Sequence, residues 1–167
     1  MQLRGQPKAS SPGLKSLIIT QLLDLEGGVR RATVHSDQAL EEASLEIRAT
    51  GAAIVAISPQ SGGSSRKAIR EMRLSFPILL DLGGQVAHAF GLRFRLSDEL
   101  ITLYKGFGND LSVTNGEPSW TLPMPARYVI GSDGVIAYAE INPDYTQRPD
   151  PSELLPVLRR LQDPAAA

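Results

Sequence analysis

Four polar side chains close together near the N-terminus have the residue types for anion binding or acid-base chemistry. Arg30 and Arg31 are followed by Thr33 and His35, just ahead of a predicted helix. Free backbone N–H groups and the positive end of a helix dipole favour a carboxylate or phosphate at such a place. His35 could act as a general base toward the Thr33 hydroxyl if the two side chains met. We favour the simpler interpretation, a solvated turn whose arginines pair with nearby acidic residues.

A second polar segment and the other histidine are weaker candidates for a functional site. The segment Gly62-Gly63-Ser64-Ser65-Arg66-Lys67 resembles a phosphate-binding loop only in composition. It lacks the G-x-x-x-x-G-K-[ST] spacing that places backbone donors and a lysine around phosphates, so we favour a loop with a helix cap. His88 lies far from His35 in the sequence, and no cluster has the spacing of zinc or iron ligands. The sequence predicts neither a metal nor a cofactor.

A strand and a helix must position the Arg30 segment from either side. The apolar run at 17–23 is of strand length and indicates a buried strand. A helix follows, capped by Ser36 or Asp37, because its apolar residues recur on one helical face. Gly51 ends this helix, since glycine readily adopts the left-handed conformation found after a helix.

The middle of the chain predicts a crossover unit. Residues 52–58 form a continuous apolar run, which indicates a central strand covered on both faces. A helix then begins at Ser64 or Ser65, and 76–80 is the next strand, an order that argues for parallel pairing. Residues 127–140 predict an antiparallel hairpin around a glycine-containing turn. The predicted class is therefore α/β, with a central mixed β-sheet flanked by helices.

The last predicted helix has an ambiguous start. Asp150, Pro151 and Glu153 have the pattern of an N-cap, a first-turn proline and a capping-box acid. Pro156 conflicts with this pattern, because a proline inside a helix loses a hydrogen bond and clashes with the preceding turn. The helix can therefore begin later than the caps indicate.

Composition limits the kinds of protein and partner. The chain has 167 residues, 42% apolar and 21% charged, which is typical of one globular domain in water. Its 17 basic and 18 acidic side chains nearly cancel, so we expect neither nucleic acid nor membrane as partner. No run approaches the roughly 20 apolar residues of a membrane helix, and we expect a cytoplasmic protein. We expect 1–13 to be a flexible arm and 14–163 a single domain.

Several short segments agree in order and spacing with one known family, over well over half of the chain. They include Glu46-Ile47-Arg48-Ala49-Thr50-Gly51-Ala52, Val55-Ala56-Ile57-Ser58-Pro59-Gln60, Phe76-Pro77-Ile78-Leu79-Leu80-Asp81, Val86-Ala87-His88-Ala89-Phe90-Gly91-Leu92 and Tyr128-Val129-Ile130. Together they resemble the peroxiredoxin-like proteins of the alkyl hydroperoxide reductase and thiol-specific antioxidant (AhpC/TSA) family. The resemblance implies a thioredoxin-like fold and, by family, an antioxidant oxidoreductase.

The same resemblance shows a departure at the expected active site. In a gapless alignment, Gly27-Gly28-Val29-Arg30-Arg31-Ala32-Thr33 falls where the family carries two cysteines, so Arg30 and Thr33 occupy those positions. The chain has no cysteine at all. A guanidinium has no lone pair for attack on an O–O bond, and a hydroxyl does not cycle through sulfenic acid. The family's thiol chemistry is therefore not expected here.

The resemblance also places Pro125 where thioredoxin-like folds carry a cis-proline beside the active site. Trp120, with Phe107 and Tyr104, could line a pocket there, although aromatic residues in such a stretch more often pack a loop onto the domain. Arg127 follows Pro125 by two positions and either points toward the same site or lies on the surface.

We expect a pseudoenzyme that keeps the fold, lacks thiol peroxidase activity and has a binding or structural role. One alternative is an enzyme of non-thiol chemistry, or a small-anion site, built from Arg30, Thr33, His35 and Arg127 at the former active site. Another is a dimerising module, since relatives often associate through their sheets or active-site faces. The expected partners are accordingly a small anion or other small molecule, and a second copy of the chain.

Overall fold

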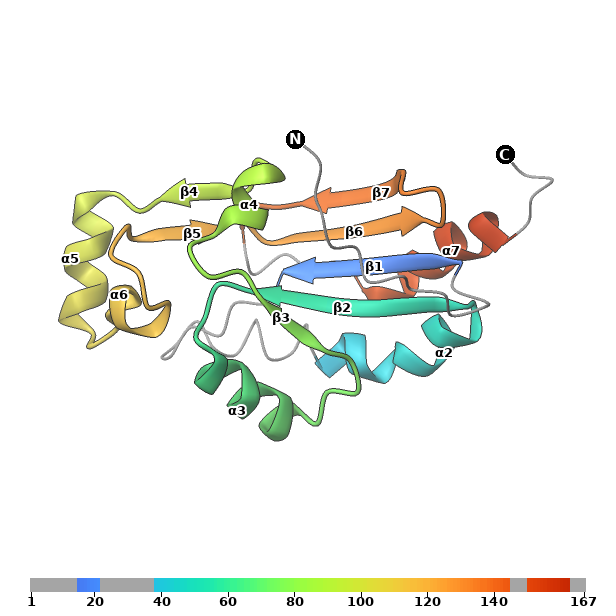
Figure 1. Ribbon diagram of the computed structural model, residues 1–167, viewed down its shortest axis with the longest axis horizontal. Helices are drawn as coiled ribbons and strands as arrows, with labels where there is room; N and C mark the ends of the chain where they lie inside the picture. Colours follow the sequence, from blue (N-terminus) through green and yellow to red (C-terminus); the bar gives the residue numbers. More distant parts are fainter. Residues whose placement is uncertain (1–14, 22–37, 145–149, 163–167) are drawn as a thin grey trace, which may run out of the picture.

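A five-stranded mixed sheet forms the centre of the protein (Figure 1). The computed structural model describes residues 15–21, 38–144 and 150–162. The strand order is β3-β2-β1-β6-β7; β1 pairs in parallel with β2, as β2 does with β3, while β6 is antiparallel to both β1 and β7. The strands are β1 (Ser16–Gln21), β2 (Ala52–Ser58), β3 (Ile78–Leu80), β6 (Ala126–Gly131) and β7 (Ile136–Ile141).

Helices cover the two faces of this sheet unequally. α2 (Ser44–Ala49) and α7 (Leu154–Gln162) pack on one face, whereas the short α4 (Gln85–Ala89) lies on the other (Figure 1). α3 (Gly62–Met72) carries the chain from β2 to β3. Among the described elements, the face with α4 is therefore the less covered of the two.

The main core lies between the sheet and the two helices α2 and α7. Ile18 of β1 is in register with Ile54 on one side and Val129 on the other, and all three are buried. Ile47 of α2 and Leu154 of α7 close over this row and are fully buried. Side chains alternate along a strand, so the apolar residues of neighbouring strands meet on one face.

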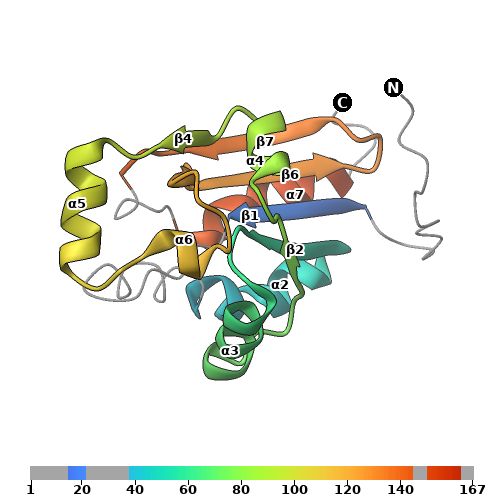
Figure 2. The ribbon, with the colours of Figure 1, turned by 60° about the vertical axis from the view of Figure 1, so that its left-hand side comes forward.

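A smaller unit stands at one end of the molecule (Figure 2). Its core consists of Leu96, Leu111, Trp120 and Leu122. Its elements are the antiparallel strands β4 (Arg93–Arg95) and β5 (Thr121–Pro123), with α5 (Asp98–Gly106) and α6 (Leu111–Thr114) between them. Ser97 caps α5 by accepting a hydrogen bond from Leu100 N, as expected of a serine at this position.

The structure confirms the α/β class, the crossover unit and the hairpin, and it moves several helix boundaries. α3 begins at Gly62, before the predicted Ser64 or Ser65. The helix predicted to end at Gly51 is interrupted, because residues 38–42 are helical, 43 is a turn and α2 begins at Ser44. Its predicted caps and the 1–13 arm lie outside the described residues.

The C-terminal helix shows how Pro156 is accommodated. Asp150 accepts a hydrogen bond from Ser152 N at 2.8 Å, and a 3-10 turn, η1 (Pro151–Glu153), precedes α7. Pro156 is therefore in the first turn of α7, where a backbone N–H has no intrahelical acceptor to lose.

The prediction of a cis-proline is wrong. No peptide bond in the described part of the chain is cis, so Pro125 follows a trans bond between β5 and β6. Within the same residues, no helix combines the length and the apolar character needed to cross a membrane.

Candidate functional site

Buried polar side chains gather where β1 and β2 end. Parallel strands place their carboxyl ends at the same edge of a sheet, and the antiparallel β6 begins at that edge. Thr20 and Arg127 are register partners there, and Ser58 ends β2. All three are at least nine-tenths buried. We define this carboxyl edge as the candidate site, because open α/β sheets bind ligands beyond the carboxyl ends of their strands.

Arg127 is the charged residue of this edge, and only 3% of its surface is exposed. A buried charge is costly unless other groups compensate it. Glu140 is its register partner on β7, and the Tyr138 hydroxyl donates to Glu140 Oε2 at 3.4 Å. Arg127 therefore lies in an environment with an acidic neighbour and is not on the surface.

The charge of Arg127 affects the pKa values of two neighbouring groups, Tyr138 and Asp150. Burial raises the pKa of Tyr138, Glu140 adds to the rise, and the positive charge of Arg127 opposes it. The pKa of Asp150 is lowered, first by hydrogen bonds from Ser152 and further by the charge of Arg127. Arg127 thus acts on both the β7 side and the α7 side of the edge.

Of the site residues proposed from the sequence, Arg127 lies at this edge. Arg30, Arg31, Thr33 and His35 lie outside the described residues, so their roles stay predictions. The chain leaves β1 at Gln21, next to Thr20, so the undescribed segment 22–37 starts from the same edge.

Trp120 and Pro125 both have structural contacts in the described part of the chain. Trp120 is buried with Leu122 in the smaller core, and Lys105 Nζ lies 5.1 Å from the centre of its ring. Its φ of 52° is in the left-handed region, which is uncommon for a bulky residue. Pro125 links β5 to β6, and its carbonyl accepts a hydrogen bond from Asn142 N. A ligand role for either residue stays a prediction.

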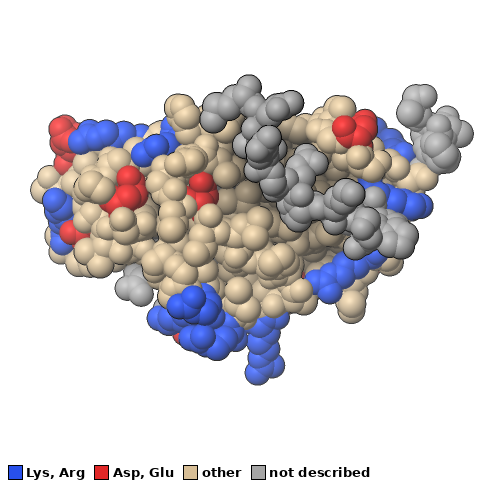
Figure 3. Space-filling model, viewed as in Figure 1, with Lys and Arg blue, Asp and Glu red and all other residues tan. Residues whose placement is uncertain are grey.

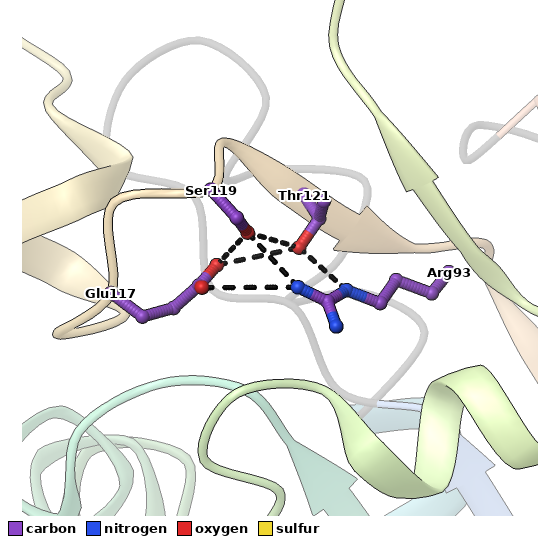
Figure 4. Close-up of polar contacts among 4 residues, drawn as sticks. All are labelled: Arg93, Glu117, Ser119 and Thr121. Atoms are coloured by element: carbon purple, nitrogen blue, oxygen red, sulfur yellow. Dashed lines mark hydrogen bonds and ion pairs between the residues drawn. The ribbon is translucent and has the colours of Figure 1, made fainter.

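A second polar cluster was not predicted from the sequence (Figure 4). Arg93 Nε donates to Thr121 Oγ1 at 2.9 Å, and Arg93 Nη2 donates to Ser119 Oγ at 3.1 Å. Nη2 also lies 3.8 Å from Glu117 Oε2, and Ser119 Oγ donates to Glu117. The alternation of polar residues at 117, 119 and 121 was the available signal, but Arg93 is distant in sequence.

The two polar sites have in common a guanidinium with hydroxyl and carboxylate groups near it. No group of three or more His, Cys, Asp or Glu within 15–21, 38–144 and 150–162 could hold a metal ion. The chain as a whole has no thiol nucleophile, since it has no cysteine. The guanidinium of each site is a hydrogen-bond donor and has no acceptor atom.

The chain resembles known proteins in family and fold. A model of the AhpC/TSA family matches residues 36–139. No curated protein is similar enough to count as a match.

The similar solved structures include a cysteine-to-serine mutant of Peroxiredoxin 6 from Arenicola marina (16% identity, TM-score 0.63, 90% of this chain and 62% of that one). AhpC of Enterococcus faecalis is another, at 18% identity and TM-score 0.63, covering 89% and 75%. Peroxidoxin BcpB of Mycobacterium tuberculosis has 15% identity and TM-score 0.61, covering 86% and 78%. The chain thus spans 62% of the length of the first of these, and at such identities the similarity establishes the thioredoxin-like fold alone.

Proposed function

The chain belongs to the AhpC/TSA family, and because it contains no cysteine we propose that it is a member without thiol peroxidase activity whose role is binding. The missing cysteine carries this proposal. A peroxide is reduced by attack of a thiolate, and the sulfur must then pass through sulfenic acid. Arg30 and Thr33, which we expect at the two cysteine positions from the resemblance extended without gaps, cannot perform that cycle.

The test is hydroperoxide turnover by metal-free protein. Hydrogen peroxide and tert-butyl hydroperoxide are offered with dithiothreitol as reductant, and a cysteine-containing AhpC serves as positive control. We expect a rate equal to that of buffer. Saturable turnover by this chain would contradict the proposal.

The carboxyl edge supports a small-anion site as the retained binding function. Arg127 supplies a buried guanidinium at this edge, and Thr20 is its register partner on β1. The segment that carries Arg30 and Thr33 starts from this edge. The anion would be a carboxylate or phosphate, which suits the planar donors of arginine.

Thermal unfolding with a panel of carboxylates and phosphates tests the anion site. A ligand of the folded state alone stabilises it by about 2.7 kcal/mol at a hundred times its Kd. We expect one anion to stabilise the wild type but not Arg30→Ala. Arg159→Ala, which removes an exposed arginine of α7, is the control and should respond as the wild type does. If no anion stabilises the wild type, the anion site is excluded, and if one anion stabilises all three proteins equally, Arg30 is not part of the site.

Self-association is the second candidate, because the sheet face with α4 exposes apolar residues. Leu79, Leu82 and Val86 are between 40% and 59% exposed. Beside them, Ile19, Phe90 and Tyr128 line an apolar hollow. Figure 3 shows few charged side chains on the uncovered centre of this face. Such patches mark interaction sites, so we expect the mass measured by sedimentation to rise with concentration. A constant monomer mass would exclude this role.

A further inference from the structure

Three basic side chains share the exposed face of α3. Arg66 and Arg70 are about one helical turn apart, and Lys67 lies beside both of them on the helix surface. All three are exposed, whereas Ser65 and Ala68 on the other side of the helix are buried. Figure 3 shows a cluster of basic side chains at the place of α3, at the lower edge of the view. We call Arg66, Lys67 and Arg70 the basic strip of α3.

The basic strip keeps an excess of positive charge. None of its three side chains makes a hydrogen bond or an ion pair with a residue that the structure describes. Glu71 is the single acidic residue of α3. Arg73, which follows α3, does not belong to the strip, because it lines a hollow together with three glutamates, Glu41, Glu42 and Glu71. The whole chain has a net charge of −1, so this positive excess is local.

Exposed leucines adjoin the basic strip. β3 follows α3 and is an outer strand of the five-stranded sheet. Leu79, Leu80 and Leu82, on and just after β3, are between 44% and 59% exposed. A Cβ placed on Gly62 would lie 3.3 Å from Leu80 Cδ1 and 3.3 Å from Arg66 Nη1. Leu80 and Arg66 therefore lie against the same backbone position, and the leucines begin where the basic strip ends.

An anionic bilayer suits both halves of this surface. Its headgroups attract lysine and arginine, and each such residue near the bilayer strengthens binding by roughly fivefold. Leucine side chains are stabilised when they leave water for the boundary between headgroups and acyl chains. A nucleic acid would also pair with the charges, but single strands are held largely by aromatic side chains. The basic strip and the three leucines contain no aromatic residue, so the combination favours a lipid surface.

We propose that the basic strip and the three leucines bind the surface of a membrane rich in anionic lipids. This inference goes beyond the binding role proposed above and does not depend on it. The expectation that a membrane is not a partner considers the total charge of the chain, whereas attachment to a bilayer depends on the charge of the face that meets it. Leu79 and Leu82 also belong to the self-association candidate, so the experiment separates the two.

Co-sedimentation of the full chain with vesicles tests this proposal. Vesicles of equal parts phosphatidylcholine and phosphatidylglycerol are compared with vesicles of phosphatidylcholine alone. We expect saturable binding to the anionic vesicles and none to the neutral ones. Raising the ionic strength from about 0.01 M to about 1 M shortens the Debye length from about 30 Å to about 3 Å, so most of the binding should be lost.

Charge reversal with a matched control assigns the binding to the basic strip. Arg66→Glu combined with Arg70→Glu should weaken binding to anionic vesicles at least about twentyfold. Arg159→Glu combined with Arg160→Glu changes the net charge equally at exposed positions of α7, and this variant should bind as the wild type does. Without vesicles, the Arg66 and Arg70 variant should have the wild-type mass in sedimentation, which separates membrane binding from self-association.

A second pair of variants tests the leucines. Leu79→Gln combined with Leu82→Gln should weaken binding at least about fivefold, because apolar groups no longer leave water. Leu45→Gln combined with Leu103→Gln, which changes exposed leucines of α2 and α5, should not weaken it.

Three results would overturn the proposal: no binding to anionic vesicles, equal binding to both kinds of vesicle, or equal binding by a test variant and its control. A single-stranded oligonucleotide is the remaining probe. If it binds through Arg66 and Arg70 while the vesicles do not, the surface belongs to nucleic acid and the proposal is wrong.

Discussion

Thr20 of β1 and Arg127 of β6 are register partners on neighbouring antiparallel strands, and both are buried at the carboxyl edge of the sheet. A hydroxyl and a guanidinium are thus carried by the central strand of the sheet and by one of its two neighbours. Strand pairing positions groups more rigidly than a loop does. The edge therefore keeps its polar character independently of the segment that follows β1.

Replacing Arg127 should destabilise the protein and raise the pKa of the neighbouring Tyr138. Arg127→Met removes the charge while keeping much of the side-chain length. We expect a loss of about 1 to 3 kcal/mol, since nearby polar groups lose a buried partner. The pKa of Tyr138 should rise further, because Arg127 lowers it in the wild type. Urea unfolding and an absorbance titration, compared with Tyr138→Phe, measure the two effects. Arg159→Met is the surface control, and its free energy of unfolding should lie within about 0.5 kcal/mol of the wild-type value. Equal free energies of unfolding for Arg127→Met and Arg159→Met would contradict a stabilising role of Arg127.

The sequence predicts the central sheet well because its signals are local. The apolar run of β2 and the turn between β6 and β7 each lie within a few residues, and both appear in the structure. The polar cluster depends on Arg93 meeting Thr121, 28 positions later, across a pair of three-residue strands. No local periodicity marks such a contact. The cis-proline expectation came from the family alone, and the trans bond before Pro125 contradicts it.

Two residues of α2 provide a matched test of core packing. Ile47 is fully buried against the sheet, whereas Leu45 is 78% exposed on the same helix. Ile47→Ala should cost about 2 to 5 kcal/mol, because it removes buried apolar surface and leaves a cavity. Leu45→Ala should change the free energy of unfolding by no more than about 0.5 kcal/mol. Denaturant unfolding of both variants measures this, and similar costs would mean that α2 does not pack on the sheet through Ile47.

The Asp150 cap should make stability depend on pH in the acidic range. Hydrogen bonds from Ser152 lower the folded-state pKa of Asp150 below its ordinary value of 3.8. The ionised carboxylate therefore contributes stability that is fully present above the ordinary value and is lost as pH falls through the lowered pKa. Asp150→Asn keeps an N-cap without titrating. The stability difference between wild type and variant should shrink as pH falls through this range. A difference constant with pH would show that the cap carries no such linkage.

Gly84 should be intolerant of a side chain although it sits at a turn. It adopts a φ of +64°, and an added Cβ would lie 3.3 Å from Arg93 Cδ. Gly84→Ala should therefore cost about 1 to 2 kcal/mol in backbone strain, with a further loss if Arg93 is displaced. Gly106, at the end of α5, is the control, because an added Cβ there would meet nothing within 4 Å and its φ is not positive. Gly106→Ala should be neutral or stabilise by about 0.4 to 1 kcal/mol. Thermal unfolding of both variants is the measurement. If Gly84→Ala is as stable as Gly106→Ala, neither the backbone conformation nor the close approach to Arg93 constrains position 84.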